Sequence, residues 1–152
     1  MGCCLGSARL FDGLIQLLLP LLGAAVFAEQ LREFLLAGLL LVGEGGGDMH
    51  DCEPALREFV AQHALEPQIR FTGPVSNVQD WLQAADAFVF PTENEAFGLS
   101  LVEAMACGLP AVTTRVGGLR DFVAHRVNAW AMEPGDAAGL TAGLRALLVE
   151  WL

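Results

Sequence analysis

The chain has 152 residues, a length that predicts one compact domain and leaves no room for a second. Its hydrophobic fraction of 54% and its mean hydropathy of +0.49 exclude disordered, collagen-like and disulfide-scaffold classes. All eight basic residues are arginine, and the 18 acidic residues give a net charge of −10, which argues against nucleic acid or an anionic lipid surface as a partner.

The N-terminal segment, residues 1–35, contains an apolar run at residues 14–22 that lies between Asp12 and Glu29. A helix that crosses a membrane needs about 20 apolar residues, and this run is shorter and contains Pro20. No basic n-region and cleavage site of a secretory signal accompany it. We therefore expect a buried helix of a globular protein.

From residue 36 onward, short apolar runs alternate with helical periodicity, which is typical of a parallel sheet covered by helices on both faces. Strands are predicted at residues 36–42, 69–72, 87–90, 111–114 and 129–132. Each is followed by a loop and a helix, and helices are predicted at residues 53–63, 77–84 and 99–107 and from Asp136 onward. Gly108 suits the C-cap of the third helix, and Asp136 suits the N-cap of the last. The pattern predicts an α/β fold whose ligands bind at the carboxyl ends of the strands.

The cysteines form no pattern that indicates a disulfide framework. A metal site at His50, Asp51 and Cys52 is disfavoured, because three consecutive residues do not converge on one tetrahedral ion and no second Cys/His pair follows. We expect neither a metal nor a cofactor.

Two of the loops at predicted strand ends carry weak signals. The glycine cluster at residues 43–47 permits close approach of a ligand to the backbone, and it is equally well explained as a turn. Residues 70–75 run from a strand into a Gly-Pro turn whose backbone groups can hydrogen-bond a flat base edge, but the sequence there supports only a turn.

The strongest signal follows the strand at residues 87–90. Glu95 falls in the loop, Gly98 opens a helix, and Glu103 falls in the second turn of that helix. Each carboxylate can accept hydrogen bonds from a vicinal diol, while free N–H groups at residues 97–100 and the helix dipole favour a phosphate nearby. Spacing alone favours a simpler alternative, in which Glu95 is a solvated loop residue and Glu103 an ordinary helix glutamate.

The same stretch resembles the signature E-x-F-G-x-x-x-x-E-A-M-A-x-G-x-P of family-four retaining glycosyltransferases of the GT-B fold. The matching residues are Glu95, Phe97, Gly98, Glu103, Ala104, Met105, Ala106, Gly108 and Pro110. The resemblance continues through residues 40–45, 70–73, 85–91, 116–118 and 134–136, and it covers about residues 36–152. It implies a single Rossmann-like domain with a parallel sheet, one half of a GT-B glycosyltransferase, in which residues 36–152 bind the nucleotide sugar and residues 1–35 are a poorly matched segment.

The resemblance also implies roles for individual residues. Glu95 would be the catalytic residue that contacts the donor sugar, and Glu103 would hold the ribose hydroxyls. The residues implied to bind the donor are Arg9, Gly43, Phe71, Val75, Phe97, Gly98, Leu99 and Glu103. Phe97, Gly98 and Leu99 would donate from the backbone, and Gly43 and the loop from Phe71 to Val75 would line the nucleotide side.

One part of the family pattern is degraded. The family carries an arginine and a lysine on the donor diphosphate; Arg9 corresponds to the arginine, but Asp12 and Gly13 stand where the family has Lys-Gly. The departing diphosphate therefore loses charge stabilisation of roughly several kcal/mol. Weak catalysis, or none, is the expected consequence for the chain alone.

We expect a donor-binding domain of a hexosyltransferase, which transfers sugar with retention once an N-terminal acceptor domain completes it. The alternative is a truncated, non-catalytic domain that binds nucleotide sugar or docks on a separate subunit; an unrelated flavodoxin-like domain conflicts with the glutamate motif. The expected partners are a nucleotide-sugar donor, an acceptor that is a glycan, a lipid or a small molecule, and an N-terminal acceptor domain or a second copy. The expected location is cytoplasmic, with peripheral attachment at the inner face of a membrane left open.

Overall fold

The computed structural model describes residues 38–44 and 53–147. The chain divides into two compact units between Val75 and Ser76, and each unit is described by itself. The expected helix at residues 14–22 lies outside the described residues, and the single-domain organisation stays a prediction.

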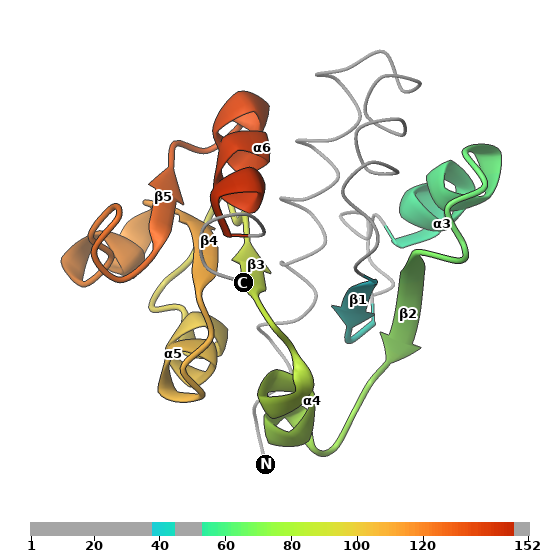
Figure 1. Cartoon of the computed structure of the whole chain (residues 1–152), viewed down its shortest axis with the longest axis horizontal. Helices are drawn as coiled ribbons and strands as arrows, with labels where there is room; N and C mark the ends of the chain where they lie inside the picture. Colours follow the sequence, from blue (N-terminus) through green and yellow to red (C-terminus); the bar gives the residue numbers. More distant parts are fainter. Residues whose placement is uncertain (1–37, 45–52, 148–152) are drawn as a thin grey trace. The chain divides into compact units, whose positions relative to one another are not determined.

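The first unit contains strand β1 (Leu39–Val42), helix α3 (Glu53–Gln62) and strand β2 (Ile69–Gly73) (Figure 1). The two strands are parallel, and Leu39 lies opposite Ile69. The register shifts by one residue between Leu41 and Val42, at the carboxyl end where the chain leaves the sheet. The residues that form the core of this unit are Leu41, Leu56, Phe59, Val60, Leu65 and Ile69.

Helix α3 forms where the sequence predicts it, with Pro54 in its first turn and buried Leu56, Phe59 and Val60 on one face. It ends in a Schellman motif, in which the Leu65 N–H donates to the Val60 carbonyl over 3.0 Å. The residue that turns the chain there is Ala64, with φ of 52°. A non-glycine residue in this left-handed conformation is strained.

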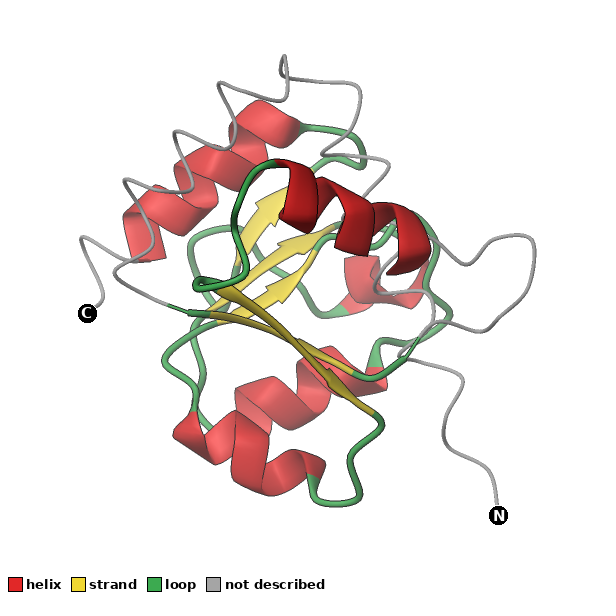
Figure 2. Ribbon diagram, turned by 90° about the vertical axis from the view of Figure 1, so that its right-hand side faces the viewer, coloured by secondary structure: helices red, strands yellow, loops and turns green. Residues whose placement is uncertain are grey.

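The second unit contains the remaining elements in the order α4, β3, α5, β4, η1, β5 and α6. Their bounds are α4 Val78–Ala84, β3 Phe88–Phe90, α5 Leu99–Ala106, β4 Ala111–Thr114, the 3-10 helix η1 Gly117–Asp121, β5 Trp130–Met132 and α6 Ala137–Ala146. The strands form a parallel sheet in the order β3-β4-β5, and Figure 2 shows them side by side.

The central strand β4 is buried at all four of its positions, as expected for a strand covered on both faces. Helix α5 contacts β3 and β4, and helix α6 contacts β4 and β5. Leu82 of α4, Ala104 of α5 and Leu109 form a further buried cluster beside β3. These helices provide the apolar cover that a parallel sheet requires.

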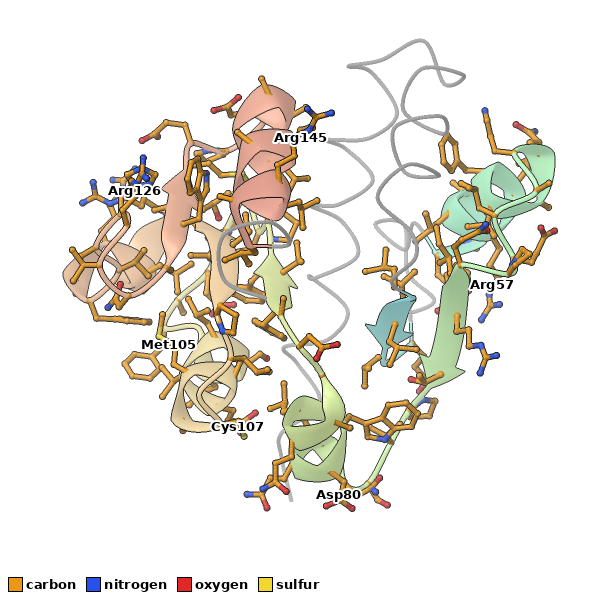
Figure 3. All side chains as sticks on the ribbon, viewed as in Figure 1. Arg57, Asp80, Met105, Cys107, Arg126 and Arg145 are labelled. Carbon is orange, nitrogen blue, oxygen red and sulfur yellow. The ribbon has the colours of Figure 1, made fainter. Side chains whose placement is uncertain are left out.

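The ends of α5 and α6 confirm the predicted caps. Gly108 follows α5 with φ of 80°, and the Leu109 N–H donates to the Ala104 carbonyl over 3.1 Å. The Asp136 carboxylate accepts from the Gly139 N–H over 2.8 Å at the start of α6. Cys107, which caps α5, is a free thiol and is labelled in Figure 3.

The predicted α/β class with parallel strands is confirmed, and all five predicted strands are present. The expected helix after each strand is wrong for β4, which is followed by the five-residue η1 and an irregular loop. In that loop Arg126 has φ of 60°, and its guanidinium lies 5.5 Å from the centre of the Trp130 ring (Figure 3).

Candidate functional site

The loop that carries Glu95 begins at the carboxyl end of β3 and is attached to the neighbouring strand by threonine hydroxyls. Thr113 donates to the Phe90 carbonyl over 3.0 Å, and Thr114 donates to the Thr92 carbonyl. Thr92 itself donates to the Asn94 carbonyl over 3.0 Å. The side chains of these threonines are buried and satisfied, so the first residues of the loop are fixed to β4.

The Glu95 side chain folds back toward the start of α5. One of its carboxylate oxygens, Oε1, accepts from the Phe97 N–H over 3.1 Å. Its Cγ lies 3.6 Å from the point where a Cβ on Gly98 would stand. The carboxylate is therefore held at the amino end of the helix, where the helix dipole favours negative charge.

Helix α5 begins with Gly98 as its N-cap residue, in the left-handed conformation with φ of 88°. The first N–H groups of a helix have no acceptor within the helix. Those of Leu99 and Ser100 have no hydrogen-bond partner within residues 38–44 and 53–147. Of the predicted backbone donors, the Phe97 N–H is already bound to Glu95, and the Leu99 and Ser100 N–H groups have no acceptor among the described residues.

Glu103 is exposed in the second turn of α5, as predicted. It lies four residues after Leu99, so both side chains occur on the same face of the helix, about 6 Å apart along its axis. Phe97 and Leu99 are exposed for 55% and 53% of their surface, and the Phe97 ring lies 6.2 Å from the Phe122 ring. Glu95, Phe97, Gly98, Leu99 and Glu103 are thus gathered on one loop and one helix of the second unit.

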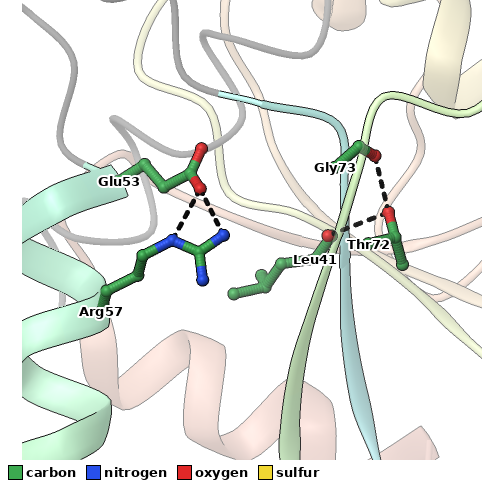
Figure 4. A network of polar contacts seen from close by, with 5 residues as sticks. All are labelled: Leu41, Glu53, Arg57, Thr72 and Gly73. Carbon is green, nitrogen blue, oxygen red and sulfur yellow. Dashed lines mark hydrogen bonds and ion pairs between the residues drawn. The ribbon is translucent and has the colours of Figure 1, made fainter.

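The other predicted site residues belong to the first unit. Gly43 follows β1 with φ of 120°, and its N–H donates to the Gly73 carbonyl over 3.1 Å. Beside this pair the Thr72 hydroxyl donates to the carbonyls of Gly73 and Leu41 (Figure 4). Val75 is half-buried at the end of this unit, and Arg9 lies outside the described residues.

The Phe71 ring is half-buried and packs against the core of the first unit. The Arg57 guanidinium lies 4.0 Å from the centre of this ring. Arg57 in turn forms an ion pair with Glu53 over 2.6 Å (Figure 4). A hollow of about 370 Å³ adjoins the ring, and its lining residues are Arg57, Val60, Glu66, Ile69, Arg70 and Phe71.

Two absences concern the described residues only. No three His, Cys, Asp or Glu side chains gather as metal ligands among the described residues, and His50, Asp51 and Cys52 lie outside them. None of the helices that the structure describes is long and apolar enough to span a membrane.

Sequence reasoning assigned no role to Gly117 and Gly118, which contact the Glu95 loop through the backbone. The Gly118 N–H donates to the Glu95 carbonyl over 3.4 Å. A Cβ on Gly117 would stand 1.7 Å from the same carbonyl oxygen. The available signal was the pair of adjacent glycines after a buried strand, which indicates a close approach of two backbone segments.

Comparisons with known proteins show the family to which the chain belongs. The family model described as Glycosyl transferases group 1 matches residues 15–150. N-acetyl-alpha-D-glucosaminyl L-malate synthase of Bacillus anthracis is 38% identical over 104 residues, which are 68% of this chain and 26% of that protein. A D-inositol 3-phosphate glycosyltransferase of Xylanimonas cellulosilytica is 36% identical over 143 residues, 93% of this chain and 34% of that protein.

Among solved structures, HepE of Anabaena in complex with UDP and glucose superimposes with a TM-score of 0.74 and 26% identity, covering 88% of this chain and 37% of that one. Sucrose-phosphate synthase of Thermosynechococcus elongatus superimposes with a TM-score of 0.71 and 26% identity, covering 94% of this chain and 34% of that one. The chain spans about a quarter to a third of the length of the curated relatives named above. It has the α/β architecture of part of a GT-B glycosyltransferase and belongs to the family of glycosyl transferases group 1.

Proposed function

We propose that this chain binds a nucleotide-diphosphate sugar and, when an N-terminal acceptor domain completes it, transfers the sugar with retention of anomeric configuration. The observation that carries the proposal is the arrangement at the start of α5. There the Glu95 carboxylate is held on the Phe97 N–H, next to the open Leu99 and Ser100 N–H groups, while Glu103 lies exposed on the following turn.

The charges at the start of α5 suit different parts of the donor. Carboxylates repel phosphate, so the diphosphate is assigned to the N–H groups of Leu99 and Ser100, where the helix dipole also attracts an anion. Each carboxylate is suited to accept hydrogen bonds from a pair of hydroxyls. We therefore assign the transferred sugar to Glu95 and the ribose to Glu103, so that the donor extends along the exposed face of α5.

The nucleotide side is assigned to Gly43 and the segment from Phe71 to Val75, which the family resemblance implies. The backbones of Gly43 and Gly73 pair with each other in a bridge at the ends of β1 and β2. A backbone without side chains permits a planar base to approach closely. Because the Phe71 ring packs on the core and under Arg57, the contribution of Phe71 to the base is assigned to its backbone rather than to its ring.

In the proposed transfer, the bond between the anomeric carbon and the diphosphate oxygen breaks, and its electron pair leaves with the nucleoside diphosphate. The acceptor oxygen forms the new bond on the same face of the sugar, and its proton passes to an oxygen of the departing diphosphate. The Leu99 and Ser100 N–H groups would stabilise the charge that develops on the departing diphosphate. The proposal assigns no role to a metal. A cytoplasmic location of the protein is also proposed, because its proposed substrates are nucleotide-sugar donors.

The HepE structures with UDP, with UDP and glucose and with UDP-glucose support the assignment of a nucleotide-sugar donor. A second candidate function is a non-catalytic domain that binds the donor without transferring sugar. It is favoured by the absence of lysine from the whole chain and by Asp12 at the position where the family has the diphosphate-binding lysine.

Calorimetric titration with UDP, GDP and ADP tests the binding assignment. Glu103→Ala is expected to weaken the binding of the nucleoside diphosphate by about 1.5–3 kcal/mol, the value of a lost hydrogen bond to a charged group. Glu66→Ala removes an exposed carboxylate from the first unit and serves as a control for net charge. Equal affinities of Glu103→Ala and the parent would exclude Glu103 as a ligand.

Incubation with nucleotide sugars and a panel of acceptors separates transfer from binding. The isolated chain is expected to bind the donor without forming glycosylated product, because positioning of the acceptor hydroxyl contributes several kcal/mol to barrier lowering. Product at ordinary enzymatic rates would show that the chain suffices and would exclude the non-catalytic candidate. When product forms, its anomeric configuration, read by NMR, decides between retention and inversion.

A further inference from the structure

Three consecutive residues of η1 contact the loop that carries Glu95. Gly117 and Gly118 lie against the carbonyl oxygens of Glu95 and Ala96, and Leu119 lies against Gly98. We call Gly117, Gly118 and Leu119 the η1 clamp. The contacts connect positions about 20 residues apart in the sequence, and none of them involves a charged side chain.

The two glycines of the clamp admit no side chain. Gly117 has φ of 47°, and a Cβ there would stand 1.7 Å from the Glu95 carbonyl oxygen. A Cβ on Gly118 would stand 2.3 Å from the Ala96 carbonyl oxygen and 3.2 Å from the Phe97 Cα. These neighbours are backbone atoms, so a methyl group at either position must displace the loop itself.

The third residue of the clamp, Leu119, packs against the backbone at the start of α5. Leu119 is fully buried, and its Cδ2 atom lies 2.3 Å from the point where a Cβ on Gly98 would stand. The Glu95 Cγ lies 3.6 Å from the same point. Gly98 is therefore enclosed between Leu119 and the Glu95 side chain, and the backbone at 95–98 is held along its whole length.

We propose that Gly117, Gly118 and Leu119 are positioning residues, which fix the Glu95 carboxylate relative to the amino end of α5 and so set the affinity for the sugar end of the donor. This inference rests on the proposed function and extends it to residues that touch no part of the donor. Displacing the Glu95 loop would move the carboxylate, while Glu103, further along α5, would keep its place. The sugar contact would then be lost selectively, and the contact to the nucleoside diphosphate would remain.

The test compares Gly118→Ala with the parent by titration with UDP-glucose and with UDP. The clamp predicts that Gly118→Ala lowers the affinity for UDP-glucose relative to that for UDP by about tenfold or more, as for a lost hydrogen bond to a charged group. The amide resonance of Phe97, whose N–H donates to Glu95, is expected to shift at the same time. Gly135→Ala is the control, since Gly135 has φ of 77° and nothing lies within 4 Å of an added Cβ.

Leu119→Val is a second variant, which removes one methylene beside Gly98 and keeps the test decisive if Gly118→Ala does not fold. Two results for a folded variant would overturn the positioning role. One is an unchanged Phe97 resonance, and the other is an equal loss of affinity for UDP-glucose and for UDP. If the parent binds neither ligand, UDP and UDP-glucose are not its ligands and that part of the proposed function fails. The Phe97 resonance of the variants then still decides whether the clamp holds the loop.

Discussion

Replacing Gly98 by alanine tests the packing at the start of α5. Gly98 has φ of 88°, and a Cβ there would stand 2.3 Å from Leu119 Cδ2. The left-handed conformation costs a non-glycine residue about 1–2 kcal/mol, and an extra methyl group in a filled space costs about 1–3 kcal/mol. Gly98→Ala is therefore expected to lower the free energy of unfolding by about 2–5 kcal/mol.

The other end of the same helix provides the matched control. Gly108 has φ of 80°, and nothing lies within 4 Å of an added Cβ. Gly108→Ala therefore carries the backbone strain without the steric overlap, and we expect a loss of about 1–2 kcal/mol. The difference between the two variants measures the contact of Gly98 with Leu119.

Urea denaturation at equilibrium, analysed by linear extrapolation, gives both free energies of unfolding. In a Leu119→Ala background the methyl group at position 98 has room, so Gly98→Ala should cost no more there than Gly108→Ala does in the parent. Equal destabilisation by Gly98→Ala and Gly108→Ala in the parent would refute the proposed packing of Leu119 at the helix start.

The remaining predictions concern the ends of α3 and α6. Ala64→Gly should stabilise the protein by about 0.5–1 kcal/mol in urea denaturation, because glycine relieves the left-handed strain at φ of 52° but has more freedom in the unfolded chain; a loss of stability would contradict the Schellman geometry at α3. Asp136→Ala should cost about 1 kcal/mol by removing the acceptor of the Gly139 N–H, while Asp136→Asn should stay within a few tenths of the parent. An Asp136→Ala variant with the same melting temperature as the parent would show that this cap does not stabilise the protein.

Much of the second unit could be predicted from the sequence because its signals are local. The buried strand at Ala111–Thr114 is a short β-rich run, Gly108 and Pro110 mark the end of α5, and Asp136 marks the start of α6. The position of Glu95 in the loop and Glu103 on the helix follows from the spacing within one continuous motif. Each of these features depends on residues within a few positions of one another.

The features that the sequence did not predict depend on distant residues or on side-chain conformation. η1 has no helical periodicity, and its glycines are explained only by the Glu95 and Ala96 carbonyls about 20 positions earlier. The Phe97 N–H was expected to be free, but the Glu95 side chain adopts a conformation that reaches it. The position of the Phe71 ring under Arg57 likewise joins β2 to α3, two elements whose contact no local pattern encodes.

The most direct test of the donor-binding assignment is an amide-resolved NMR titration of the protein with UDP, GDP and ADP in turn. The account predicts that the nucleoside diphosphate that binds shifts the Leu99 and Ser100 amide resonances most, and that this footprint persists in Glu66→Ala and weakens in Glu103→Ala. Millimolar concentrations of all three nucleotides that leave the resonances of residues 95–103 unchanged would contradict the account.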